Sequence, residues 1–330
     1  MGLVYAKLFA GVLIVFLLGY RFLVRLPFSF DARILLESVK IAYPMTPRIF
    51  LGVIGTRFDQ YMIGLLGSLG GVGIYNIGQK VAAMVFVYIT SLENVFSPHV
   101  YKSMFEQKER GGKIIGSYLT AFAYISIFLA LVVIVFSREI ISLLTPPAYH
   151  NAADIIVILS LYYGFLFFEK ITGMQLVYAK KTHITSVLVI ATYALNIALN
   201  IPFIIRWGAF GAAWATLLTG LISGTVFFFV AQKYYLIVWE YRKIAVIFFL
   251  FIFSAFSILT LNAFYVWYPV QFAVKLLLIT SYILLGLKLR LITKDNFLLV
   301  KNALLFKKFD AVPPADVAEV VAPEPGSLKP

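Results

Sequence analysis

Ionisable side chains interrupt several long apolar stretches of this sequence, and they are its first candidates for chemistry. An ionisable group at bilayer depth costs about 2.5–3.5 kcal/mol on insertion scales, so it normally faces a cavity or a charged partner. A turn near Leu69 and Gly70 would fold two of these stretches into a helical hairpin. We expect this hairpin to bring together two oppositely charged pairs, Asp59 with Lys80 and Arg48 with Glu93.

These charges are compatible with two roles. Both pairs could be structural salt bridges that hold the hairpin together. Alternatively, the cations Arg48, Arg57 and Lys80 could present positive charge to an anionic substrate. The candidates for a substrate path are therefore Arg48, Arg57, Asp59, Lys80 and Glu93.

A second group of charges lies in a later apolar stretch, where Glu169 and Lys170 are adjacent. Neighbouring positions of a helix point about 100 degrees apart, so these two side chains do not fully pair with each other. Glu169 could be a carboxylate that couples transport to protons or sodium, or each residue could find a partner on a neighbouring helix. Glu169 and Lys170 are the coupling candidates.

Other chemistry has little support in the sequence. The chain has no cysteine and three histidines, none at metal-ligand spacing, so neither a metal nor a cofactor is expected. Gly71 and Gly73 begin a G-x-G pattern, but Asn76 occupies the third glycine position. His150 and Asp154, four residues apart, could interact where a later apolar stretch begins.

Composition predicts a membrane protein. Apolar residues make up 62% of the 330 residues and mean hydropathy is +0.92. Charged residues make up 13%, against about 25% in soluble domains. The net charge of +13 would suggest nucleic-acid binding in a soluble protein, but here attraction to anionic lipid explains it. We expect membrane lipid, and no nucleic acid, as a partner.

The apolar stretches predict an all-α integral membrane protein with about nine transmembrane helices. The first stretch is long and is followed by Arg21, Arg25 and Arg33, so we interpret it as a retained helix and not as a signal peptide. The predicted spans are 3-23, 38-66, 72-98, 115-136, 153-177, 184-205, 209-231, 243-264 and 269-290.

Lysine and arginine residues gather in every second connection between these spans. Connections on one side of the series hold 18 of them and those on the other side hold 3. The positive-inside rule places the basic side in the cytoplasm, with the carboxyl terminus inside and the amino terminus outside. An outside start without a signal suggests that further sequence belongs upstream.

The last predicted span is followed by two segments of different character. Residues 293-309 contain an apolar run with lysines, which predicts a short helix lying in the cytoplasmic interface. Residues 310-330 are rich in proline and alanine and are expected to be disordered.

Several residue blocks resemble the polysaccharide and O-antigen flippases, which belong to the superfamily of multidrug, oligosaccharidyl-lipid and polysaccharide exporters. The most specific block, TRFDQYMIGLLGSLGGVGIYNIGQK at 56-80, looks like the junction of that family's seventh and eighth helices. Other similar blocks are KIAYPMTPRIFLG at 40-52, SLENVFSPHVYKSM at 91-104 and WGAFGAAWATLLTG at 207-220. The resemblance covers residues 1 to 290.

The family resemblance implies two lobes of six helices, often with two further helices at the carboxyl end. Matching the blocks makes 1-30 the sixth helix of the family, 31-235 a six-helix lobe and 236-292 two additional helices. Five helices of the amino-terminal lobe would then be absent. The resemblance therefore predicts either a partial chain or a missing lobe supplied by another chain.

The function implied by this resemblance is the flipping of undecaprenyl-linked oligosaccharide across the bacterial cytoplasmic membrane by alternating access, without enzymatic activity. The expected partners are the polyprenyl-diphosphate-linked oligosaccharide and polysaccharide polymerase machinery, and the cations of the hairpin would face the pyrophosphate. Two alternatives are a drug or cation exporter of the same superfamily and a membrane glycosyltransferase or O-antigen ligase.

Overall fold

The computed structural model describes residues 2–25, several residues between 31 and 43, and residues 46–264 and 266–291. Within these ranges the chain is helical and contains no strand. It divides into two compact units, Met1–Thr46 and Pro47–Pro330. The predicted interfacial helix at 293-309 and the predicted disordered tail at 310-330 lie outside the described residues.

The first unit contains one long helix, α1 (Gly2–Arg25), which covers the predicted span 3-23. At about 1.5 Å per residue its 24 residues extend for about 36 Å, enough to cross a hydrocarbon core of about 30 Å. Its apolar side chains between Tyr5 and Tyr20 are exposed, as the side chains of a helix surrounded by lipid would be.

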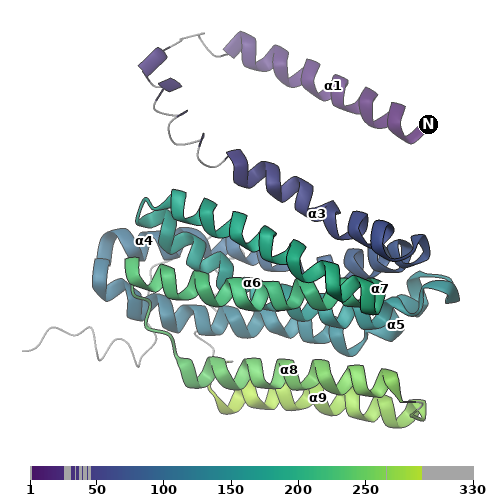
Figure 1. The fold of residues 1–330 in the computed structure, drawn as a ribbon. Coiled ribbons are helices and arrows are strands. Elements are labelled where there is room, and N and C mark those ends of the chain that lie inside the picture. Colours follow the sequence, from purple (N-terminus) through teal and green to yellow (C-terminus); the bar gives the residue numbers. More distant parts are fainter. Residues whose placement is uncertain are drawn as a thin grey trace, which may run out of the picture. The chain divides into compact units, whose positions relative to one another are not determined.

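The second unit is a helical bundle (Figure 1). Six stretches of its described residues are long and apolar enough to cross a membrane: Leu69–Lys108, Arg110–Val135, Ala152–Tyr178, Thr182–Tyr234, Tyr241–Ala263 and Tyr268–Lys288. The chain is an all-α integral membrane protein, as its composition predicted. The elements are α3 (Thr46–Leu66), α4 (Leu69–Val135), α5 (Ser137–Leu144), the short 3-10 helix η2 (Pro147–Tyr149), α6 (Ala152–Tyr178), α7 (Thr182–Tyr234), α8 (Tyr241–Ala263) and α9 (Tyr268–Lys288).

Two of these helices break at a single residue. The backbone leaves helical geometry at Lys108 in α4 (φ 46°, ψ −117°) and at Gly208 in α7 (φ 56°, ψ −134°). Positive φ values are unfavourable for residues with a Cβ atom, so glycine suits the second break and lysine is strained at the first. We call residues 69–108 and 110–135 the first and second arms of α4, and residues 182–207 and 209–234 the first and second arms of α7. The four arms account for the predicted spans 72-98, 115-136, 184-205 and 209-231.

Helix α6 forms the centre of the bundle. It packs extensively against α4 and α7, and more than half of its residues are buried. Helix α8 packs against α4 and α6, and α9 packs against α4 and α8. A pair of stacked tyrosines fixes α9 to α4: the Tyr282 hydroxyl donates to the Tyr124 carbonyl at 2.8 Å, and the Tyr124 hydroxyl donates to the Tyr282 carbonyl at 3.1 Å. The two helices after α7 are therefore an integral part of the bundle.

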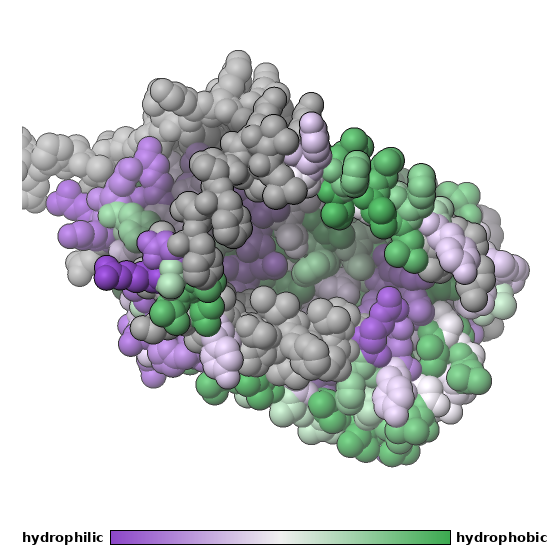
Figure 2. Space-filling model, turned by 90° about the horizontal axis from the view of Figure 1, so that it is seen from above, coloured by the Kyte–Doolittle hydropathy of each residue, from purple (hydrophilic) through white to green (hydrophobic). Residues whose placement is uncertain are grey.

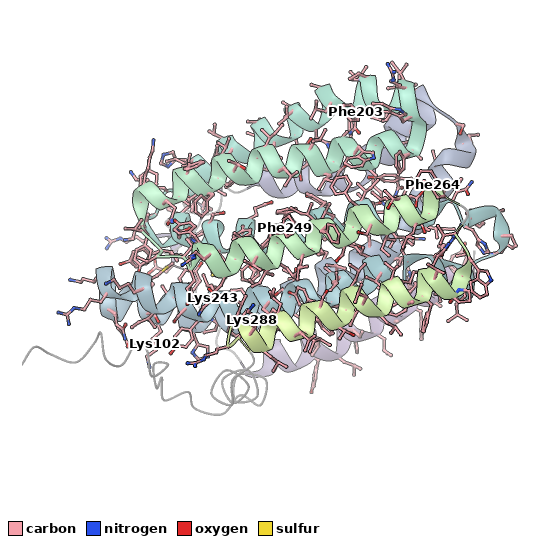
Figure 3. The ribbon with its side chains drawn as sticks, turned by 90° about the horizontal axis from the view of Figure 1, so that it is seen from below. Lys102, Phe203, Lys243, Phe249, Phe264 and Lys288 are labelled. Carbon is pink, nitrogen blue, oxygen red and sulfur yellow. The ribbon has the colours of Figure 1, made fainter. Side chains whose placement is uncertain are left out.

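Basic residues gather at one end of the bundle. Lys102, Lys243 and Lys288 lie at this end, whereas Phe203 and Phe264 lie at the other (Figure 3). This end is on the left in Figure 3, and Figure 2 also shows strongly hydrophilic residues on the left. The fold thus brings together, at one end of the bundle, basic residues that are far apart in the sequence.

The connection between α7 and α8 lies against the beginning of the second arm of α4. Val238 N–H donates to the Gly112 carbonyl at 3.1 Å, and the Tyr235 hydroxyl donates to the Lys108 carbonyl at 2.7 Å. Burial raises the pKa of Tyr235 to about 12, so this hydroxyl keeps its proton at neutral pH. A Cβ atom on Gly116 would overlap the Val238 carbonyl, so the close approach requires glycine there.

Substitution of Gly116 with Ala is therefore expected to destabilise the bundle by about 1–3 kcal/mol, because neither the helix nor the connection can move apart without losing contacts. Thermal unfolding of the purified protein in detergent measures this effect. Gly173→Ala in α6 is the matched control, since nothing lies within 4 Å of its added methyl group. Equal melting temperatures for the two variants would contradict the prediction.

Candidate functional site

The most distinctive polar site in the described bundle surrounds the carboxylate of Asp59 on α3. This side chain is buried and accepts three hydrogen bonds. The Tyr75 hydroxyl and the Asn200 Nδ2 each lie 2.8 Å from a carboxylate oxygen, and the Thr216 hydroxyl lies 3.1 Å away. The site therefore joins α3, the first arm of α4 and both arms of α7.

The turn between α3 and α4 positions the first two residues. Ser68 caps the amino terminus of α4, because its hydroxyl accepts the Gly71 N–H at 3.0 Å. Asp59 lies eight residues before Gly67 and Tyr75 eight residues after it. The two side chains are thus at the same height on antiparallel helices, about 12 Å from the turn.

The break at Gly208 positions the other two residues in the same way. Asn200 lies eight residues before Gly208 and Thr216 eight residues after it. Both side chains reach the one carboxylate of Asp59, so the two arms of α7 must run back beside each other. The site therefore lies at the same distance from this break as from the α3–α4 turn, well inside the bundle.

All three hydrogen-bond donors to Asp59 are neutral. Among the described residues, Asp59 forms no salt bridge. Neutral donors stabilise a carboxylate, but the desolvation cost of an isolated buried charge remains large. A bound proton or a bound cation would remove that cost, so the geometry is suited to binding one positive charge.

Further oxygen atoms lie near this carboxylate. Asn200 Oδ1 is buried and has no hydrogen-bond partner, and the Asn196 side-chain oxygen accepts from Asn200 Nδ2 at 3.0 Å. Carboxylate, amide and hydroxyl oxygens are suitable ligands for a hard cation. The described residues contain no group of three or more acidic, histidine or cysteine side chains that could hold a metal. One carboxylate among neutral oxygens fits a proton or a monovalent cation better than a divalent one.

A second group of polar side chains lies next to this site on α3 and α4. Gln60, next to Asp59, donates to the Gln79 side chain at 2.9 Å, and the exposed Arg57 donates to Gln60 at 3.4 Å. Figure 2 shows hydrophilic residues within the mainly hydrophobic right-hand half of the molecule. Arg57, Gln60 and Gln79 thus form a polar cluster beside Asp59 on α3 and the first arm of α4.

The predicted pairing of Asp59 with Lys80 is wrong. The turn falls at Gly67 and Ser68, before the predicted position at Leu69 and Gly70, because the Ser68 cap starts α4 there. This shift places Tyr75 opposite Asp59 and leaves Lys80 exposed. Arg57 lies near the site but faces solvent or lipid.

Glu93, which was predicted to pair with Arg48, forms a salt bridge with another helix. Glu93 pairs with Lys170 of α6 at 2.8 Å, and the Lys170 ammonium also lies over the Phe86 ring at 5.4 Å. Arg48 is in α3, but its side chain lies outside the described residues. A partner for Lys170 on a neighbouring helix was one of two sequence-based alternatives, and it is the one observed. Glu169 is half-buried in α6, and its coupling role stays a prediction.

Sequence reasoning missed the neutral members of the site, Tyr75, Asn200 and Thr216. The signal available for one of them was the pair Asn196 and Asn200, whose i, i+4 spacing places two amides on one face of an apolar helix. His150 and Asp154, which could have interacted with each other, have other hydrogen-bond partners: His150 Nε2 lies 3.3 Å from the Thr145 carbonyl. Asp154 accepts from Asn262 of α8 at 2.7 Å.

A buried ion pair near the other end of the chain was missed as well. Lys275 of α9 is 1% exposed, and its ammonium contacts both carboxylate oxygens of Glu139, at 2.6 and 2.8 Å. Glu139 belongs to α5, so this pair ties the short helix to the last one. Lys275, which lies in the middle of the final apolar span, was the signal for it.

The chain was compared with known proteins. Residues 1–154 match a family described as polysaccharide biosynthesis protein. The chain resembles the polysaccharide biosynthesis proteins. This finding confirms the resemblance inferred from the block at 56-80. The matched residues include α1, α3, α4 and α5, and with them Asp59 and Tyr75 of the buried site. No curated protein and no solved structure matches the chain.

Proposed function

We propose that this chain takes part in flipping a polyprenyl-diphosphate-linked oligosaccharide across the bacterial cytoplasmic membrane, as part of surface polysaccharide biosynthesis. The family match supports a role in polysaccharide biosynthesis, and the multi-pass helical fold supports action on a membrane-embedded substrate. The observation that carries the transport mechanism is the buried carboxyl group of Asp59, which forms no salt bridge with any described residue. Such a group is costly to keep in a membrane unless it binds a charge in part of a cycle.

In this mechanism the oligosaccharide headgroup passes through a polar cavity by alternating access while the polyprenyl tail stays in lipid. Binding of a proton or sodium ion at Asp59 would change the contacts among α3, α4 and both arms of α7, because the same carboxylate holds all four segments. A ligand shifts a conformational equilibrium only through such differential contacts. The pyrophosphate would be attracted by cations such as Arg57 and Lys80.

The proposed orientation follows from the basic end of the bundle. Lys102, Lys243 and Lys288 share that end (Figure 3), and the positive-inside rule assigns it to the cytoplasm. The turn at Gly67 and the break at Gly208 would then lie toward the outer leaflet. The carboxyl terminus would be cytoplasmic.

Reconstitution tests the proposed substrate. The full chain in proteoliposomes that carry fluorescent polyprenyl-diphosphate-linked oligosaccharide should move the glycan across the bilayer, so that an added membrane-impermeant glycosidase cleaves more of it than in empty liposomes. The expected increase depends on a sodium or proton gradient. A rate equal to that of empty liposomes under both gradients would reject the proposal.

The second candidate is a drug or cation exporter of the same superfamily. The specific observation in its favour is again Asp59, since a buried carboxylate is what export of an organic cation requires. The same proteoliposomes distinguish the two candidates. Export of a fluorescent organic cation without oligosaccharide translocation would assign the chain to drug export.

A further inference from the structure

A groove of about 320 Å³ lies between α6, the second arm of α7 and the beginning of α8. Its walls are almost entirely apolar, and the exposed Phe229 at its edge shows that it opens to the surroundings of the bundle. Because α7 continues to Tyr234, the groove lies within the membrane-spanning part of the helix, toward its basic end. Its principal lining residues are Phe165, Phe168, Gly220, Gly224, Phe228 and Trp239.

One polar group of the groove has no partner. Trp239 is 4% exposed, and its indole N–H is buried without a hydrogen-bond acceptor. Its ring is fixed by edge contacts with Phe168 at 5.4 Å between centroids, so it cannot easily turn away. A buried donor without an acceptor costs free energy, which an oxygen atom of a bound molecule would recover.

Cations lie beside the same end of the groove. Lys233 is two turns after Thr225 and one turn after Phe229, so these three residues share a face of α7. Arg242 follows the lining residue Tyr241 in the first turn of α8, and both Lys233 and Arg242 are exposed. Lys243 is less available because it pairs with Glu240 at 2.6 Å.

We propose that this groove binds a phospholipid with an anionic headgroup. One acyl chain lies along the glycines and phenylalanines, a phosphate or ester oxygen accepts the Trp239 indole N–H, and the headgroup lies beside Lys233 and Arg242. Basic residues next to a membrane span attract anionic lipid, and an apolar groove at the same height gives the chain a defined place. This inference is independent of the transported substrate.

Native mass spectrometry of the purified full chain in detergent tests the site, with phosphatidylglycerol and phosphatidylcholine as probes. One phosphatidylglycerol should remain bound in preference to phosphatidylcholine. Trp239→Phe keeps an aromatic ring but removes the donor, and should weaken phosphatidylglycerol binding about tenfold, as expected for one hydrogen bond to a charged group. Gly224→Phe should abolish it by filling the groove, since nothing lies within 4 Å of a Cβ at that position.

Gly173→Phe is the matched control, because Gly173 also has open space around it but does not line the groove. This variant should bind phosphatidylglycerol like the unchanged protein. Unchanged binding in Trp239→Phe would overturn the proposal even if Gly224→Phe failed to fold. Equal binding of the two phospholipids would also overturn it, as would displacement of phosphatidylglycerol by equimolar polyprenyl phosphate, which would assign the groove to a polyprenyl chain.

Discussion

Replacement of Asp59 with Asn is expected to reduce oligosaccharide translocation by at least about tenfold, within the range of typical coupling free energies. Asn has nearly the same shape and still offers an oxygen to the Tyr75 and Thr216 hydroxyls. It lacks the negative charge that a proton or cation would neutralise. The measurement is gradient-driven translocation in proteoliposomes, normalised to the amount of reconstituted protein.

Glu240→Gln is the control for this prediction. It also removes a carboxylate, but Glu240 is paired with Lys243 and about one-third exposed, so its loss should cost no more than about 1 kcal/mol of stability. Sodium gives a second measurement that does not depend on transport. If sodium is the coupling ion, sodium chloride should raise the melting temperature of the unchanged protein relative to choline chloride, and this increase should disappear in Asp59→Asn. Full translocation by Asp59→Asn would exclude Asp59 as the coupling group.

Replacement of Glu139 with Gln is expected to destabilise the bundle by about 3 kcal/mol. The change leaves the ammonium of Lys275, which is 1% exposed, without its counter-charge. Removing one member of a buried pair typically costs about 3–5 kcal/mol, and the partial exposure of Glu139 places the effect at the lower end. Thermal or denaturant unfolding in detergent measures the loss.

The double variant Glu139→Gln with Lys275→Met distinguishes charge from packing. Methionine is apolar and of similar length, so the double variant should recover most of the stability lost in the single variant. Glu240→Gln provides an exposed comparison, because the Glu240–Lys243 pair is about one-third exposed and should contribute less than about 1 kcal/mol. If the double variant were as unstable as Glu139→Gln alone, the buried charge would not be the cause.

The sequence predicted the helices of the bundle well because a long apolar stretch has few stable alternatives in a membrane. The spans 153-177, 243-264 and 269-290 lie within one or two residues of α6, α8 and α9. The sequence predicted the positions of the turns less accurately. The Ser68 cap, which accepts the Gly71 N–H, marks the α3–α4 turn, but the glycines beside it make several neighbouring positions equally plausible from the sequence alone.

This small error had a large effect on the predicted site. Asp59 was recognised as important because it is a charge in an apolar stretch, but its partners were sought among other charges. Tyr75, Asn200 and Thr216 are neutral, and two of them come from a helix more than a hundred residues away. Only the tertiary fold brings Asn200 and Thr216 to Asp59, and no local pattern specifies that arrangement.

The break at Gly208 has a mechanical consequence. A single residue joins the two arms of α7, so the connection is too short for one arm to slide along the other. Asp59 accepts a hydrogen bond from each arm, eight residues from Gly208 in both cases. The turn that connects α3 to α4 is also short, at Gly67 and Ser68. In the proposed mechanism, a change of one charge at Asp59 would therefore tilt whole helical arms and would not loosen the connections between them.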